Sequence, residues 1–378
     1  ICYFELHQLF LILLEYFFLS FPFIMLTYNI CYIITLLYYN IMINKFSTFI
    51  ISLFTAVLFT FSNLSADIKV VASIKPIHSL VSYVMDGIGK PSLIVDGSNS
   101  PHNFNMKPSN AKDIENADII FWVGEDIESF LEKPLKSISK KAKIIEMMDI
   151  KGINKLKFRE RNIFEDHKGH DHGHKKKDKH DDHGHKKKES HDHGHGHKKE
   201  VKHDDHGHGH GEFDPHIWLN PHNAEVMVEE IAKQLIAIDP QNSATYKKNS
   251  ERAVKDIEKL INTTKKELKK NISFIVFHDA YQYFEKEFNV SALGALTLNT
   301  DVAPGAKQIS EIREIIEHDN VKCLFSEPQF NPDIIKSIAK GTKVKVGVLD
   351  PLGANLDNGK DLYFNLIKDI SSSLKKCI

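Results

Sequence analysis

SFIVFHDAYQYF at residues 273–284 is the stretch that decides the fold. Its first part, 273–277, is mostly apolar, rich in β-strand formers and too short for a helix, so it predicts a buried strand. His278 follows directly, and the spacing of the next residues predicts a helix over 279–287. Strands that alternate with helices are typical of a parallel sheet. Because open α/β folds present ligand groups at the carboxyl ends of such strands, His278 is a candidate binding residue.

The same alternation recurs from Asp67 to the end of the chain and predicts two α/β lobes with mainly parallel sheets. In the first lobe the predicted strands are IKVVASI (68–74), LIVDG (93–97) and DIIFWVG (118–124), with KIIEMM (143–148) as a candidate fourth. In the second, SFIVF is followed by SALGAL (291–296), KCLFS (322–326) and VKVGVL (344–349). Further helices are predicted over 79–86, 109–116, 223–238, 306–318 and 331–340.

The predicted lobes are separated by one long amphipathic stretch. Apolar residues recur at helical spacing through 240–270, which predicts a rigid helix joining the lobes. We therefore expect an N-terminal lobe over 67–239 and a C-terminal lobe over 271–378.

The N-terminal residues are expected to lie outside both lobes. Residues 1–41 begin with Ile and are almost wholly apolar and aromatic. Residues 42–66 begin with Met and have the order of an export signal, with a lysine, an apolar run and then small residues. We predict that 1–41 is an upstream or mis-annotated segment, that 42–66 is a signal peptide, and that the mature protein starts near Asp67. A membrane anchor is the alternative, because the apolar stretch is long enough to cross a bilayer.

Charge and cysteine usage narrow the class of protein. The chain carries 49 Lys and Arg against 50 Asp and Glu, so net charge gives no reason to expect nucleic acid as a partner. Cys323 and Cys377 are the cysteines that remain in the predicted mature protein, and a pair of cysteines in an exported protein suggests one disulfide. Such a bond would stabilise the fold by about 4 kcal/mol. Two buried free thiols are the alternative.

A low-complexity tract interrupts the first lobe at 166–211. It consists mainly of His, Asp, Gly and Lys, holds 15 of the chain's 22 histidines, and cannot bury enough apolar surface to fold alone. We expect a disordered loop that collects metal with low affinity and raises its local concentration near a tighter site. A solvated loop with no role is the alternative. The candidate auxiliary ligands are His167, His170, His172, His174, His180, His183, His185, His191, His193, His195, His197, His203, His206, His208 and His210.

Three histidines stand apart from this tract in rigid or turning contexts. His102 lies in SPHNFNMKPS, His216 in DPHIWLNP, and His278 at the strand end described above. Asp350 follows VKVGVL at the end of another predicted strand. Three imidazoles with one carboxylate or water form the four-coordinate site that Zn2+ favours.

These motifs together resemble a known family. From about Asp67 to the C-terminus, the chain is similar to the solute-binding proteins of bacterial zinc ABC transporters, the ZnuA group of the cluster A-I metal receptors. The matching pieces are SIKPIHSLV, SPHNFNMKPS, ADIIFWVG, the His-rich insertion, PHIWLNP, FIVFHDAYQYFEK, CLFSEPQF and VGVLDPLGAN. The two cysteines also lie near the positions of that family's disulfide.

The resemblance implies a zinc site between the lobes, with His102, His216 and His278 as ligands and Asp350 at a carboxylate-ligand position. Some zinc receptors carry Glu just before the first ligand histidine. Pro101 stands there in this chain, so Asp350 or water must complete the site. Manganese and iron receptors usually carry Glu in place of His278, and nitrogen ligands shift preference toward zinc.

The expected function is high-affinity zinc capture in the periplasm and delivery to a membrane permease with a cytoplasmic ATPase, by a monomer that is not an enzyme. A manganese or iron receptor, a periplasmic zinc buffer, and a zinc hydrolase are the alternatives, although the hydrolase reading lacks an HExxH helix. Glu327 is either a partner that orients a ligand histidine or a turn residue.

Overall fold

A computed structural model describes residues 67–163, 211–268, 272–298, 300 and 304–377. The predicted leader, the alternative membrane anchor and nearly all of the His-rich tract lie outside these residues. Among the helices that are described, none combines the length and apolarity needed to cross a membrane. The described residues all belong to one compact unit that begins at Asp67.

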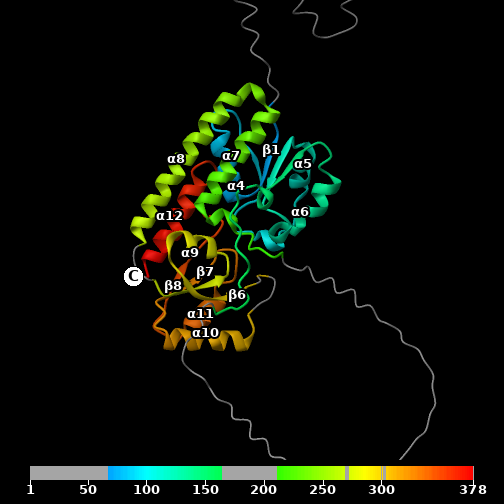
Figure 1. Cartoon of the computed structure of the whole chain (residues 1–378). Coiled ribbons are helices and arrows are strands. Elements are labelled where there is room, and N and C mark those ends of the chain that lie inside the picture. Colours follow the sequence, from blue (N-terminus) through cyan, green and yellow to red (C-terminus); the bar gives the residue numbers. More distant parts are fainter. Residues whose placement is uncertain (1–66, 164–210, 269–271, 299, 301–303, 378) are drawn as a thin grey trace, which may run out of the picture. The chain divides into compact units, whose positions relative to one another are not determined.

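All eight predicted strands form, and they build two parallel four-stranded sheets (Figure 1). The first has the order β2-β1-β3-β4 and consists of β1 (Val70–Ile74), β2 (Ser92–Val95), β3 (Ile119–Trp122) and β4 (Lys143–Glu146). The second has the order β6-β5-β7-β8 and consists of β5 (Phe274–His278), β6 (Ala292–Thr297), β7 (Cys323–Ser326) and β8 (Lys345–Val348). Every pair of neighbouring strands is parallel, so in each sheet the carboxyl ends share one edge.

Helices follow the strands as expected, with two additions. The first lobe contains α4 (Lys75–Val84), α5 (Pro108–Asn116) and α6 (Glu125–Ser137), and the second contains α9 (Gln282–Phe288), α10 (Ala306–His318) and α11 (Asp333–Ala339). Between the two sheets in the sequence lie α7 (Pro221–Ile238) and the long α8 (Ser243–Glu267). The last helix, α12 (Leu362–Lys375), returns to contact α4 and α8. Helices α6 and α12 are the two that the sequence patterns above did not predict.

The hydrophobic core is continuous between the two lobes. Along β5, Phe274 and Val276 belong to a core that also contains residues of β1, α8 and α12. Ile275 and Phe277 point to the opposite face and pack in a smaller core with α10 and α11. Because successive side chains of a strand point to opposite faces, this alternation explains why SFIVF is apolar throughout.

The predicted disulfide is present. Cys323 on β7 is bonded to Cys377, which follows α12, and both residues are buried. The alternative of two free thiols is therefore wrong. The bond attaches the end of the chain to an inner strand of the second sheet.

Candidate metal site

His102 lies in a short turn of the first lobe. The turn spans Pro101–Asn103, and the side chain of Ser100 accepts a hydrogen bond of 3.3 Å from the His102 backbone N–H. Pro101 occupies the first turn position, where a missing N–H has no cost. The local sequence Ser-Pro-His therefore fixes the backbone that carries this imidazole.

His216 is held by Asp214. One Asp214 oxygen, Oδ1, accepts both the His216 backbone N–H at 3.0 Å and the ring Nδ1 at 2.7 Å. Asp214 is fully buried, and its other oxygen accepts a hydrogen bond of 2.6 Å from Gln282 Nε2. A carboxylate can only accept, so Nδ1 of His216 carries the proton and Nε2 presents its lone pair.

His278 is held in the same way by Glu327. The residue ends β5, and Glu327 follows the neighbouring strand β7. Glu327 Oε1 accepts the His278 backbone N–H at 3.2 Å and the ring Nδ1 at 2.7 Å. Of the two readings of Glu327, the structure therefore supports the one in which it orients a histidine.

Carboxylates dominate the electrostatic environment of the His278 ring. Burial would lower the pKa of His278, but the charge and hydrogen bond of Glu327, with the charges of Asp279 and Asp214, outweigh burial and hold the pKa above its ordinary value. A negative surrounding of this kind favours a cation at the ring.

The three histidines converge on one point. Their candidate ligand nitrogens all lie within 4.8 Å of one another, and the Nε2 atoms of His216 and His278 are 3.2 Å apart. Two lone pairs at this distance repel unless a proton or a metal cation lies between them. The three rings line a cavity of about 10 Å³, together with residues of both lobes such as Ile127 and Phe330. That volume is close to the space of a single water-sized probe, which suits one ion.

Asp350 is not brought into this group. Its Oδ1 accepts hydrogen bonds from Gln329 Nε2 at 2.9 Å and from the Leu352 N–H at 3.0 Å, and its Oδ2 accepts the Ala354 N–H at 2.5 Å. Its carboxylate therefore stabilises the loop after β8. It is not among the residues whose ligand atoms converge on the cavity.

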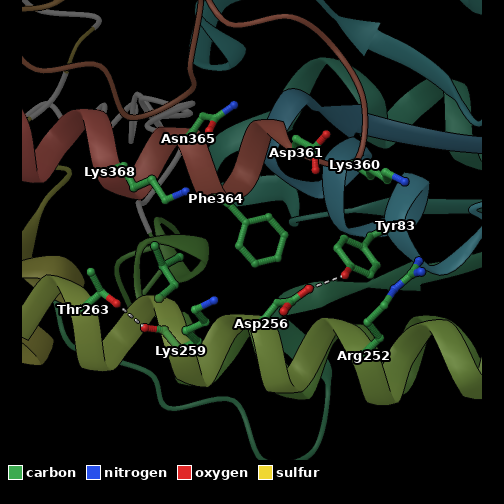
Figure 2. Close-up of a pocket in the computed structure, with 11 residues that line it drawn as sticks. Tyr83, Arg252, Asp256, Lys259, Thr263, Lys360, Asp361, Phe364, Asn365 and Lys368 are labelled. Atoms are coloured by element: carbon green, nitrogen blue, oxygen red, sulfur yellow. Dashed lines mark hydrogen bonds between the residues drawn. The ribbon is translucent and has the colours of Figure 1, made fainter.

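A wider hollow of about 800 Å³ lies elsewhere, between α8 and α12 (Figure 2). None of the residues that line it is a histidine or a cysteine. Several of its polar groups already have partners: the Tyr83 hydroxyl donates to Asp256 at 2.5 Å, and Arg252 pairs with Asp86 at 2.8 Å. Among the described residues, those that line this hollow do not form a group of candidate metal ligands, so the volume of a cavity does not by itself identify the functional site.

Two residues around the candidate metal site, Asp214 and Arg159, were not predicted from the sequence. Asp214 could have been predicted from the sequence. The side chain of an Asp commonly accepts a hydrogen bond from the backbone N–H two residues later, which here is that of His216. Arg159 could not have been predicted, because its partners Asp279 and Glu285 are more than a hundred residues away in the chain.

The family model and the relatives that match this chain name the same family. Residues 70–377 match the family model described as "Zinc-uptake complex component A periplasmic", ZnuA. The chain is 46% identical over 338 residues to the high-affinity zinc uptake system protein ZnuA of Brucella abortus, covering 89% of this chain and 99% of that protein. It is 33% identical over 320 residues to the protein of the same name from Yersinia pestis, covering 83% and 92%.

Solved structures with the same fold are more distant in sequence. A crystal structure of ZnuA superposes with a TM-score of 0.61 at 21% identity, covering 82% of this chain and 99% of that one. A zinc-bound ZnuA deletion mutant superposes with a TM-score of 0.62 at 20% identity, covering 82% and 98%. These likenesses confirm the two-lobe α/β fold.

Proposed function

The chain belongs to the ZnuA family of periplasmic zinc-uptake components, and on that premise we propose that it captures Zn2+ in the periplasm and delivers it for import. The observation that carries the proposal is the convergence of three imidazoles on one small buried cavity. The family is one of binding components, so this cavity holds cargo and the chain is not an enzyme.

We propose His102, His216 and His278 as the zinc ligands. Imidazole nitrogen suits Zn2+ better than it suits Mn2+, which prefers oxygen donors. In two of the three rings a buried carboxylate fixes the tautomer that directs Nε2 at the cavity, an arrangement common at zinc sites. Because Asp350 is engaged with its own loop, we propose that water fills the fourth position.

The partners follow from the transport role. We propose that a monomer of this chain docks on a membrane permease driven by a cytoplasmic ATPase. Cells lacking the chain should take up zinc poorly when it is scarce, and adding the gene back should restore uptake. Normal uptake by the deletion cells under zinc limitation would favour the zinc buffer instead.

The His-rich tract is proposed to be an auxiliary collector with lower affinity than the cavity. Deleting residues 167–210 should leave one tight zinc site per chain and lower only the number of weakly bound ions. Equilibrium dialysis and chelator competition on the 67–378 unit, with and without the tract, measure both quantities. Loss of the tight site on deletion would overturn the assignment of the cavity histidines.

Glu327 is expected to control zinc affinity without touching the ion. Glu327→Gln removes the charge that orients His278 and leaves a side chain of similar size, so zinc affinity should fall about 10- to 100-fold. Chelator competition at neutral pH checks this. Glu225→Gln is the matched control, because Glu225 accepts a similar bond of 2.9 Å from the exposed His222. Equal losses in the two variants would contradict the expected role of Glu327.

A further inference from the structure

Residues 159–163, which precede the His-rich tract in the sequence, contact the second lobe. Ile163 forms an antiparallel bridge with Gly294 on β6, and the Ala295 N–H donates to the Asn162 carbonyl at 2.8 Å. A Cβ built at Gly294 would lie 2.5 Å from the Asn162 oxygen, so only glycine permits this approach. The segment is therefore seated closely on the edge of the sheet that carries His278.

Arg159, in the same segment, makes two ion pairs beside the metal site. Its Nη1 lies 2.8 Å from Asp279 Oδ1, and its Nη2 lies 2.7 Å from Glu285 Oε2. The two carboxylate side chains are only 4% and 5% exposed, and that of Arg159 is 24% exposed. Because arginine presents its donors in a rigid fork, one guanidinium can hold both carboxylates in fixed positions.

Of the two carboxylates that Arg159 holds, that of Asp279 lies next to a proposed metal ligand in the chain. It directly follows the proposed ligand His278, yet its oxygens are not among the atoms that converge on the cavity. Its backbone N–H is bonded to the Thr297 carbonyl at 3.2 Å, and its side chain is bonded to Arg159. A carboxylate released at this position would add a hard oxygen donor next to a site built from nitrogen.

We propose that Arg159 is a positioning residue for metal selectivity, which holds the Asp279 carboxylate away from the cavity and so keeps a nitrogen-rich donor set that prefers Zn2+ to Mn2+. The proposal rests on the proposed zinc site at His102, His216 and His278. It concerns selectivity and not the existence of that site, so the two can fail separately.

The test is the ratio of the Mn2+ to the Zn2+ dissociation constant, measured by chelator competition on the 67–378 unit. In Arg159→Gln the freed carboxylate should strengthen Mn2+ binding relative to Zn2+, so this ratio should fall about tenfold. The electron paramagnetic resonance signal of Mn2+ should report its binding directly. Adding Asp279→Asn to Arg159→Gln should restore the ratio. If the role of Arg159 were purely structural, removing the Asp279 carboxylate would not restore it. An unchanged ratio in a folded Arg159→Gln variant would overturn the proposal.

Glu285→Gln is the matched control. It removes the other ion-pair partner of Arg159 but frees no carboxylate, so the ratio should stay at the wild-type value. If the ratio fell as much in Glu285→Gln as in Arg159→Gln, the effect would come from losing the Arg159 ion pairs and not from a freed carboxylate. That result would overturn the proposal.

A second variant keeps the proposal testable if Arg159→Gln does not fold. The double variant Arg159→Gln, Glu285→Gln leaves fewer buried charges without a partner, and its ratio should be about tenfold below that of Glu285→Gln alone. If neither variant folds, Arg159 is required for the fold itself and the selectivity role is wrong. Loss of tight zinc binding in a His216→Ala, His278→Ala variant tests the site independently.

Discussion

Replacing both His216 and His278 with alanine should abolish tight zinc binding, with the dissociation constant rising at least about 1,000-fold. The Nε2 atoms of the two rings are 3.2 Å apart, so both imidazoles would contact the same ion at the proposed site. Their removal leaves His102 and water, which is too few protein ligands for a stable tetrahedral zinc site. Chelator competition gives the affinity, and metal analysis after dialysis gives the stoichiometry.

His222→Ala is the control for this experiment. His222 is 55% exposed and pairs with Glu225 on the surface of α7, so its loss should leave tight binding unchanged. The double variant should also be combined with deletion of residues 167–210, to remove the weak sites proposed for the tract. Tight binding that persists in the double variant but disappears with the tract would make the protein a zinc buffer.

The strands and their parallel arrangement were largely accessible from the sequence because the signal was local. Each strand is a short β-branched or apolar run, and the helix over 306–318 had the predicted bounds. By contrast, α6 contains Pro134 and a non-helical Glu128, which interrupt the pattern that predicts a helix. Helix α12 was not predicted, although Leu362, Leu366, Ile370 and Leu374 recur at helical spacing; that spacing does not indicate the return of the helix to α4 and α8.

The candidate site was accessible only in part. The three histidines could be selected because each follows a strand or lies beside a proline, away from the tract. Their carboxylate partners are harder to find, since Glu327 meets His278 only because β5 and β7 are neighbours in the sheet. The bond from the Leu352 N–H to Asp350 has the same two-residue spacing as the bond within Asp214–His216, but no sequence pattern shows the further bonds that Asp350 accepts from Ala354 and Gln329. Strand order and side-chain partners are properties of the tertiary structure, so local sequence patterns do not reveal them.

Removing the disulfide should lower the free energy of unfolding by about 4 kcal/mol. Cys323 and Cys377 are 54 residues apart in the sequence, so the bond greatly restricts the unfolded chain. It also attaches α12 to β7, and α12 contacts α4 and α8, so the effect should extend to the contact between the lobes. A Cys323→Ala, Cys377→Ala variant, unfolded with urea and followed by circular dichroism, measures the loss.

Treating the wild type with a reductant is the control for this variant. The reduced wild type should lose similar stability, whereas the variant should be insensitive to the reductant. The cysteines are not among the residues that converge on the cavity, so the folded variant should retain tight zinc binding. Zinc should therefore recover part of the lost stability, because a ligand that binds only the folded state shifts the equilibrium toward it. A loss below about 1 kcal/mol would mean that the unfolded chain is already compact around this link, since the entropy argument assumes an expanded one.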